Sequence, residues 1–167
     1  MPASALRGAL LRARQLALHL SIGRPFAPPV WLSATEAALF AGMPPADQWE
    51  GLQVLAELRR WGFARDRDLL LAGLLHDMGK AQAPAKARYR MAATLLEGHP
   101  RLQRCIARHS PGLCTLANHA ALGAAMARQA ELPLDVQRLI AQHHTPVDQA
   151  QPIAARLAAL CRADALH

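Results

Sequence analysis

The chain has 167 residues and a formal net charge of +7, from 19 Lys and Arg against 12 Asp and Glu. Hydrophobic residues make up 52% of the chain and aromatic residues only 4%. This length and apolar content suit one globular domain and exclude a disordered tail, and the few aromatic rings argue against a stacking platform for single-stranded nucleic acid.

Segments rich in Ala and Leu alternate with Pro and Gly along the chain, a pattern typical of short helices. A first helix is expected over residues 4–20. Ser33-Ala34-Thr35-Glu36 is a capping box and predicts a short helix that ends near Gly42. Pro45 then starts a longer helix, which reaches about Trp61.

The next helix is expected to lie at the centre of the fold. Its residues from Leu69 to Leu75 place apolar side chains on almost every face of the helix. Asp66 or Asp68 can cap its start, and Gly79 is expected to end it. Further helices are expected over residues 85–97, 101–109, 115–130, 134–144 and 152–165. The sequence therefore predicts an all-α fold, a single compact domain of about eight or nine helices. Residues 1–44 are expected to form a helical extension and residues 45–167 the core.

The three cysteines, an odd number without C-x-x-C spacing, argue against a disulfide framework. Arginines interrupt the apolar positions near the N-terminus, so no leader peptide is predicted. The apolar stretches are also too short to span a bilayer. We therefore expect a soluble cytoplasmic protein that does not contact a membrane.

The expected central helix ends in His76-Asp77-Met78-Gly79-Lys80. A charged Asp beside a His at the end of an apolar helix is costly unless something compensates it, and a bound cation is an efficient compensator. The alternative is an Asp that caps the helix beside a solvated His. For this motif alone, both interpretations remain open.

Four more polar residues interrupt or end apolar helices. They are His119, His143, His144 and Asp164. Each alone is compatible with a hydrogen-bonded core His or an exposed Asp at a helix end. Together they are nitrogen and oxygen donors on separate helices, a set that suits Zn, Mn, Fe or a related divalent ion.

The run Leu74-Leu75-His76-Asp77-Met78-Gly79-Lys80, followed in order by these four residues, resembles the HD-domain superfamily of metal-dependent phosphohydrolases. The resemblance covers about residues 47–165. It implies one or two divalent ions (Mn, Fe, Mg or Zn) that activate water for attack on phosphorus. It also implies the following ligands: His76, Asp77 and Asp164 for one ion, and His119 and His143, together with His144, in binuclear members.

The resemblance further implies catalytic roles for two residues of the motif. Asp77 would orient or deprotonate the attacking water, and Lys80 would face a substrate phosphate. A solvated cation near a helix end is the simpler interpretation of Lys80.

The chain departs from the family pattern at its first metal ligand. That ligand is a His in the pattern His-x-x-x-Val, and here Glu50 stands four residues before Val54. Glu50 can bind metal as a hard oxygen donor, which favours Mn, Mg or Fe. Alternatively, the loss of the imidazole leaves a weak or empty site.

We therefore expect a metal-dependent phosphohydrolase for a nucleotide or another small phosphoester. The cyclic-dinucleotide branch is disfavoured, because Thr145 stands where that branch carries Glu. The alternative function is a catalytically attenuated HD-like module that binds a nucleotide or metal as a sensor or interaction domain. Nucleic-acid binding ranks last, because no recognition-helix motif is present. A basic segment could line an anion channel or simply be solvated: Lys86, Arg88, Arg90, Arg101, Arg104 and Arg108.

Overall fold

The computed structural model describes residues 23–82 and 111–167, and these two ranges contain helices and no strand. Seven are α-helices: α2 (Ala34–Ala41), α3 (Pro45–Leu58), α4 (Arg67–Leu75), α7 (Pro111–Ala117), α8 (His119–Gln129), α9 (Leu134–Gln142) and α10 (Ala154–Asp164). A π-helical turn, η1 (Arg59–Phe63), follows α3, and a 3-10 helix, η2 (Met78–Gln82), follows α4. The all-α class is confirmed.

The seven α-helices in the described ranges are slightly fewer than the eight or nine expected for the chain. The helices expected over residues 4–20, 85–97 and 101–109 lie outside the described residues, as does the basic segment around them. None of the described helices is long and apolar enough to cross a membrane. Cys114 and Cys161 are free thiols.

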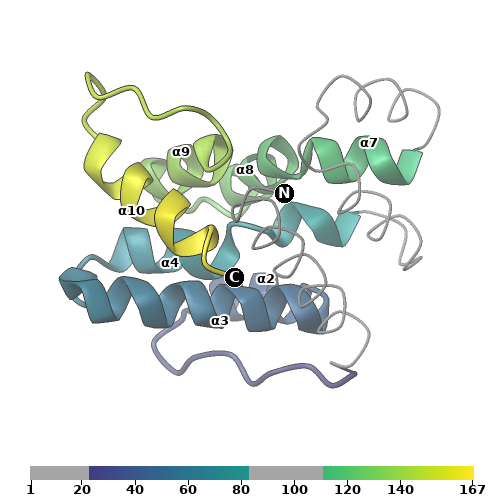
Figure 1. Ribbon diagram of the computed structural model, residues 1–167. Helices are drawn as coiled ribbons and strands as arrows, with labels where there is room; N and C mark the ends of the chain where they lie inside the picture. The colour runs from purple at the N-terminus through teal and green to yellow at the C-terminus, as the bar shows by residue number, and fades with distance from the viewer. Residues whose placement is uncertain (1–22, 83–110) are drawn as a thin grey trace, which may run out of the picture.

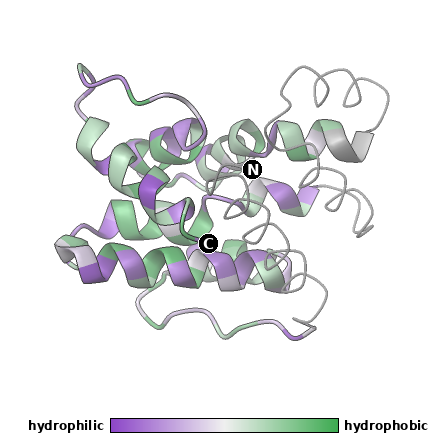
Figure 2. Ribbon diagram, viewed as in Figure 1, coloured by the Kyte–Doolittle hydropathy of each residue, from purple (hydrophilic) through white to green (hydrophobic). Residues whose placement is uncertain are grey.

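Helix α4 lies at the centre of the helical packing, between α3 on one side and α9 on the other (Figure 1). Every residue from Leu69 to Leu75 is buried, as the apolar pattern predicts. Each fully buried leucine side chain contributes about 1.5–3 kcal/mol. In Figure 2, α3 alternates hydrophobic and hydrophilic residues, in keeping with a helix that exposes one face. The core therefore surrounds α4 from Leu69 to Leu75, and polar groups lie at the two ends of this stretch.

Capping side chains fix the starts of α2 and α4. At α2 the Ser33 hydroxyl accepts from the Glu36 amide at 3.3 Å, and the Glu36 carboxylate accepts from the Ser33 amide at 2.7 Å. This confirms the capping box. At α4 it is Asp66, rather than Asp68, whose carboxylate accepts a hydrogen bond, from the Leu69 amide at 3.1 Å.

Arg156 of α10 ties that helix to two others. Its guanidinium donates to the Asp66 carboxylate at the start of α4 and to the Asp135 carboxylate at the start of α9, each at 2.7 Å. Planar guanidinium groups suit such paired contacts. The contacts fix α10, whose last residue is Asp164.

The prediction that Gly79 ends the central helix is wrong. Helix α4 ends at Leu75, with His76 as its C-cap, and Gly79 lies within η2. A Cβ atom on Gly79 would lie 2.0 Å from the backbone oxygen of His119 and 2.6 Å from the backbone nitrogen of Gly123. Glycine is therefore required because η2 and α8 touch backbone to backbone.

Two other helix boundaries differ from expectation. The helix expected over residues 115–130 is two helices, because the backbone breaks at Asn118, with φ −110° and ψ 12°. The helix that starts at Pro45 ends at Leu58 and continues as η1, in which Gly62 adopts φ 94°. Both breaks depend on backbone geometry that residue periodicity does not report.

A second close contact joins α3 to α4. A Cβ atom on Gly51 would lie 2.3 Å from the backbone oxygen of Leu74. This close contact falls directly after Glu50 and two residues before His76. This contact brings the polar residues of both helices to the same end of α4.

We predict that Gly79→Ala destabilises the fold by about 3 kcal/mol or more, because the new methyl group meets backbone atoms that cannot rotate away. Gly42→Ala is the matched control, since its Cβ would meet only ordinary contacts at 3.4 Å and 3.5 Å. Its expected effect is about 0.5 kcal/mol or less. Urea unfolding followed by circular dichroism measures both, and equal losses in the two variants would contradict the packing argument.

Candidate metal centre

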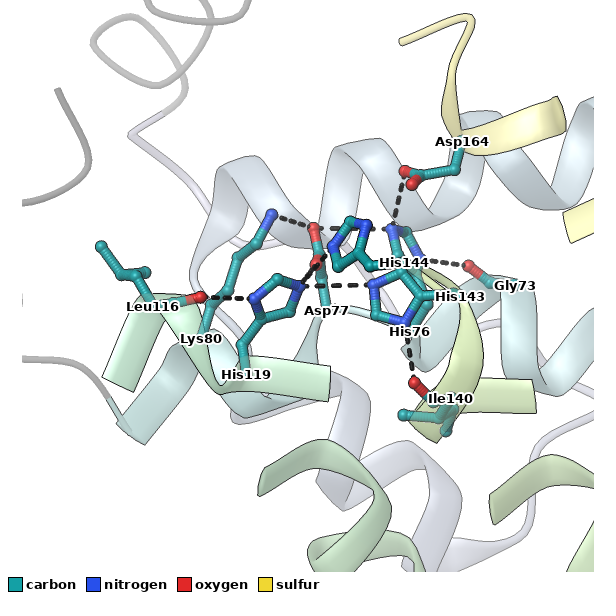
Figure 3. A network of polar contacts seen from close by, with 10 residues as sticks. All are labelled: Gly73, His76, Asp77, Lys80, Leu116, His119, Ile140, His143, His144 and Asp164. Atoms are coloured by element: carbon teal, nitrogen blue, oxygen red, sulfur yellow. Dashed lines mark hydrogen bonds and ion pairs between the residues drawn. The ribbon is translucent and has the colours of Figure 1, made fainter. Parts of the chain in front are cut away.

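The structure brings together all eight of the residues predicted to bind metal or act in catalysis. They come from the middle of α3, the segment from the end of α4 into η2, the start of α8, and the ends of α9 and α10. Figure 3 shows seven of them converging on one point: His76, Asp77, Lys80, His119, His143, His144 and Asp164. The eighth, Glu50, has a carboxylate oxygen within 4.8 Å of one from Asp77. Their roles as ligands and catalysts remain predictions.

Three of the histidines are oriented in the same way. In each, Nδ1 contacts the backbone oxygen three residues earlier: His76 to Gly73 at 2.9 Å, His119 to Leu116 at 2.6 Å and His143 to Ile140 at 2.7 Å. A carbonyl oxygen only accepts, so the proton lies on Nδ1 and the lone pair on Nε2 in the neutral ring. Metal-binding histidines are commonly held in this way.

The Nε2 atoms of three histidines face one another. His119 Nε2 lies 3.3 Å from His143 Nε2 and 3.0 Å from His144 Nε2. Neutral His119 and His143 carry no proton on these atoms, so their lone pairs repel unless a cation lies between them. Donor atoms about 2.0–2.1 Å from a tetrahedral ion are about 3.3–3.4 Å apart, which fits the observed spacing.

Asp77 lies between this nitrogen group and His76. Its Oδ1 is 3.2 Å from His119 Nε2, and its Oδ2 is 3.5 Å from His76 Nε2. Lys80 forms an ion pair with Asp77 Oδ2, and Asp164 Oδ1 lies 3.1 Å from His76 Nε2. The two oxygens of Asp77 therefore face different sets of partners.

Two atoms at this point lack hydrogen bonds. His76 Nε2 and Asp77 Oδ1 are buried, and neither has a hydrogen-bond partner of good geometry within the described residues. The two side chains are each 1% exposed. Buried polar atoms are nearly always satisfied, so a pair of exceptions at a donor cluster fits residues that ligate an ion.

Asp77 also belongs to a cluster of three carboxylates. Asp47, Glu50 and Asp77 each offer an oxygen within 4.8 Å of the other two, and Asp47 is fully buried. The sequence analysis missed Asp47. Its spacing of three residues from Glu50 places both on one face of α3, but an acid in a first helical turn is common without any ligand.

Charges within the cluster raise the pKa of His76 and lower the pKa values of Asp164 and Asp77. Burial opposes charge on His76, but the carboxylates of Asp77 and Asp164 outweigh it and raise the pKa of His76 to about 10. The reverse holds for Asp164, where burial is outweighed by His76 and the pKa falls to about 2. The pKa of Asp77 is also well below its ordinary value despite burial, mainly through Lys80 and His76.

Two histidines of the cluster, His143 and His144, stay neutral at neutral pH. Burial, reinforced by the positive charge of His76, lowers the pKa of His143 to about 3. Burial and His119 lower the pKa of His144 to about 4. Both rings therefore keep a free lone pair at neutral pH, which metal ligation requires. Burial raises the pKa of Glu50.

The comparisons with known proteins gave one match. The sequence model of a family described as HD domain matches residues 49–167, which include every residue of the cluster except Asp47. No curated protein and no solved structure matches the chain significantly.

We predict that the metal-free protein is most stable near pH 6.5. Unfolded histidine titrates there, so the stability from neutral His143 and His144 is lost as the pH falls toward their folded pKa values of about 3 and 4. The stability from protonated His76 is lost as the pH rises toward its folded value of about 10. Thermal melts in chelator should show the midpoint falling by about 4 °C or more on each side.

The variant His76→Gln separates the two limbs of this profile. It should flatten the alkaline limb and keep the acidic one, because only His76 has a raised pKa among the three rings. A midpoint that rises as the pH drops from 6.5 to 4.5 would contradict the assignment of neutral rings.

Proposed function

The chain belongs to the HD-domain family, a superfamily of metal-dependent phosphohydrolases, and from that membership we propose that it hydrolyses a small phosphoester, such as a nucleotide, with one or two divalent ions. One observation carries the proposal. The Nε2 atoms of His119 and His143 lie 3.3 Å apart while each Nδ1 faces a backbone oxygen, and His76 Nε2 and Asp77 Oδ1 have no hydrogen-bond partner of good geometry among the described residues.

The donor set divides into two parts that share Asp77. On the nitrogen side, His119, His143 and His144 would hold an ion together with Asp77 Oδ1, a set suited to Zn, Fe or Mn. On the other side, the ligands would be His76, Asp77, Asp164 and Glu50, whose oxygens favour Mn, Mg or Fe. A bound divalent ion acidifies water and polarises a phosphoryl oxygen.

The residues of the chain then orient the reactants. Asp77 is ionised at neutral pH and its pKa is low, so it suits holding and orienting a water molecule better than removing its proton. The side chain of Lys80 is 22% exposed at the edge of the cluster. An ammonium there attracts the oxygens of an approaching phosphate and stabilises negative charge as the leaving group departs.

The second candidate function is binding without turnover. Glu50 replaces the family's first histidine, and Lys80 is paired with Asp77. Both features are compatible with an attenuated module that binds a nucleotide or metal as a sensor. Metal binding without hydrolysis would favour this candidate.

We predict that the purified protein contains a divalent metal and hydrolyses a chromogenic phosphodiester such as bis(4-nitrophenyl) phosphate. Asp77→Asn should lower the rate by about 100-fold or more, because the carboxylate that would hold the ions and orient the attacking water is lost. The control Asp148→Asn removes an exposed carboxylate whose hydrogen bond within residues 23–82 and 111–167 comes from the amide of Ala150, and it should keep the full rate. Elemental analysis and assays with added Mn, Fe, Mg and Zn test this, and a metal-free protein that stays inactive with every ion would contradict it.

We predict that Glu50→His shifts the metal preference from Mn²⁺ toward Zn²⁺ by about tenfold or more, because imidazole is a softer donor than carboxylate. Competition against a fluorescent chelator measures both affinities. If their ratio stays unchanged, the Glu50 side chain is not a ligand.

A further inference from the structure

Side chains hold the end of α9, because the carbonyl groups at a helix end lack partners within the helix. The backbone oxygen of Ile140 accepts from His143 Nδ1 at 2.7 Å, and that of Gln142 accepts from the Thr145 hydroxyl at 2.8 Å. The backbone oxygen of His143 accepts from the thiol of Cys161 at 3.0 Å. The first two contacts are local in sequence, whereas the third comes from another helix, α10.

The last turn of α10 contacts two of the converging histidines. Asp164 lies three residues after Cys161, so the two side chains share one face of α10. Asp164 Oδ1 is 3.1 Å from His76 Nε2 (Figure 3), while Cys161 contacts the backbone of His143. The rings of His76 and His143 pack edge to face, with their centroids 5.2 Å apart. Helix α10 therefore holds one histidine through its ring and the other through its backbone.

The oxygen that Cys161 contacts belongs to the peptide group between His143 and His144. The position of this peptide helps to set where both rings lie, and their Nε2 atoms are 3.3 Å and 3.0 Å from His119 Nε2. Ligand distances at a metal ion vary by only about 0.2 Å, so a small shift of this peptide would misplace two donors at once. A cysteine thiol titrates at about pH 8–9, so it is a donor at neutral pH, although a weak one.

We propose that Cys161 is a positioning residue of the metal centre, whose thiol fixes the peptide between His143 and His144 and so sets the distances of their Nε2 atoms from His119. Cys161 is not itself one of the donors that converge there. The alternative is that this half-buried side chain only fills space between α10 and α9. The inference rests on the proposed function, because it assumes that an ion binds the histidine nitrogens.

The experiment measures Co²⁺ binding to the full chain, freed of metal, by competition against a fluorescent chelator. Cys161→Val removes the donor but keeps a side chain of similar size, so the Co²⁺ affinity should fall by about tenfold or more. Cys161→Ser keeps a donor and should retain the wild-type affinity within about threefold. Cys114→Val, which removes an exposed thiol, is the control and should bind Co²⁺ as wild type does.

Two results would overturn the positioning role. One is wild-type Co²⁺ affinity in Cys161→Val. The other is an equal loss in Cys161→Val and Cys161→Ser, because the side chain would then act through its packing rather than through its hydrogen bond. Should Cys161→Val not fold, Cys161→Ala replaces it in the same comparison with Cys161→Ser.

A second readout needs no metal and separates this inference from the proposed function. In ¹⁵N NMR spectra of the metal-free chain, Cys161→Val should shift the ring signals of His143 and His144, and Cys161→Ser should leave them near their wild-type positions. Unshifted ring signals in Cys161→Val overturn the inference, whether or not Co²⁺ binds. If wild type binds no Co²⁺ but the ring signals respond as expected, the proposed function fails while the thiol still positions the two rings.

Discussion

The buried carboxylate of Asp77 is the interaction on which the rest of the site depends. An isolated carboxylate at 1% exposure would cost several kcal/mol or would be protonated. Here His119 faces one oxygen, and His76 and Lys80 face the other. Because its two oxygens point to different partners, Asp77 joins a nitrogen-rich group to a carboxylate group. Removing it would take the ion-pair partner from Lys80 and the link between the two groups.

The fold explains why these groups meet where they do. Helix α4 is buried from Leu69 to Leu75, so the polar cluster lies beyond this stretch, after its last turn. The backbone contact at Gly79 brings α8 to that end, and the contact at Gly51 brings α3 there. The candidate site residues are thus brought together by close contacts at glycines that have no chemistry of their own.

Local signals allowed much of this to be predicted from sequence. The Ser33 capping box acts within one helical turn, and the HD motif is contiguous, so both are visible along the chain. The sequence marks Gly79 as a helix end, whereas the structure requires glycine there for a backbone contact with His119. That contact is not visible along the chain, because His119 is distant in sequence. Asp47 was missed because an acid near a helix start has an ordinary explanation, and only the approach of α4 makes it part of a cluster.

The central claim is that the converging histidine nitrogens and Asp77 bind a metal ion. Anomalous diffraction at the zinc edge, from crystals with one equivalent of Zn²⁺, tests it most directly. The claim predicts an anomalous peak about 2.0–2.2 Å from an oxygen of Asp77 and from three Nε2 atoms, those of His119, His143 and His144. A peak elsewhere on the protein, with these nitrogens uncoordinated, would contradict it.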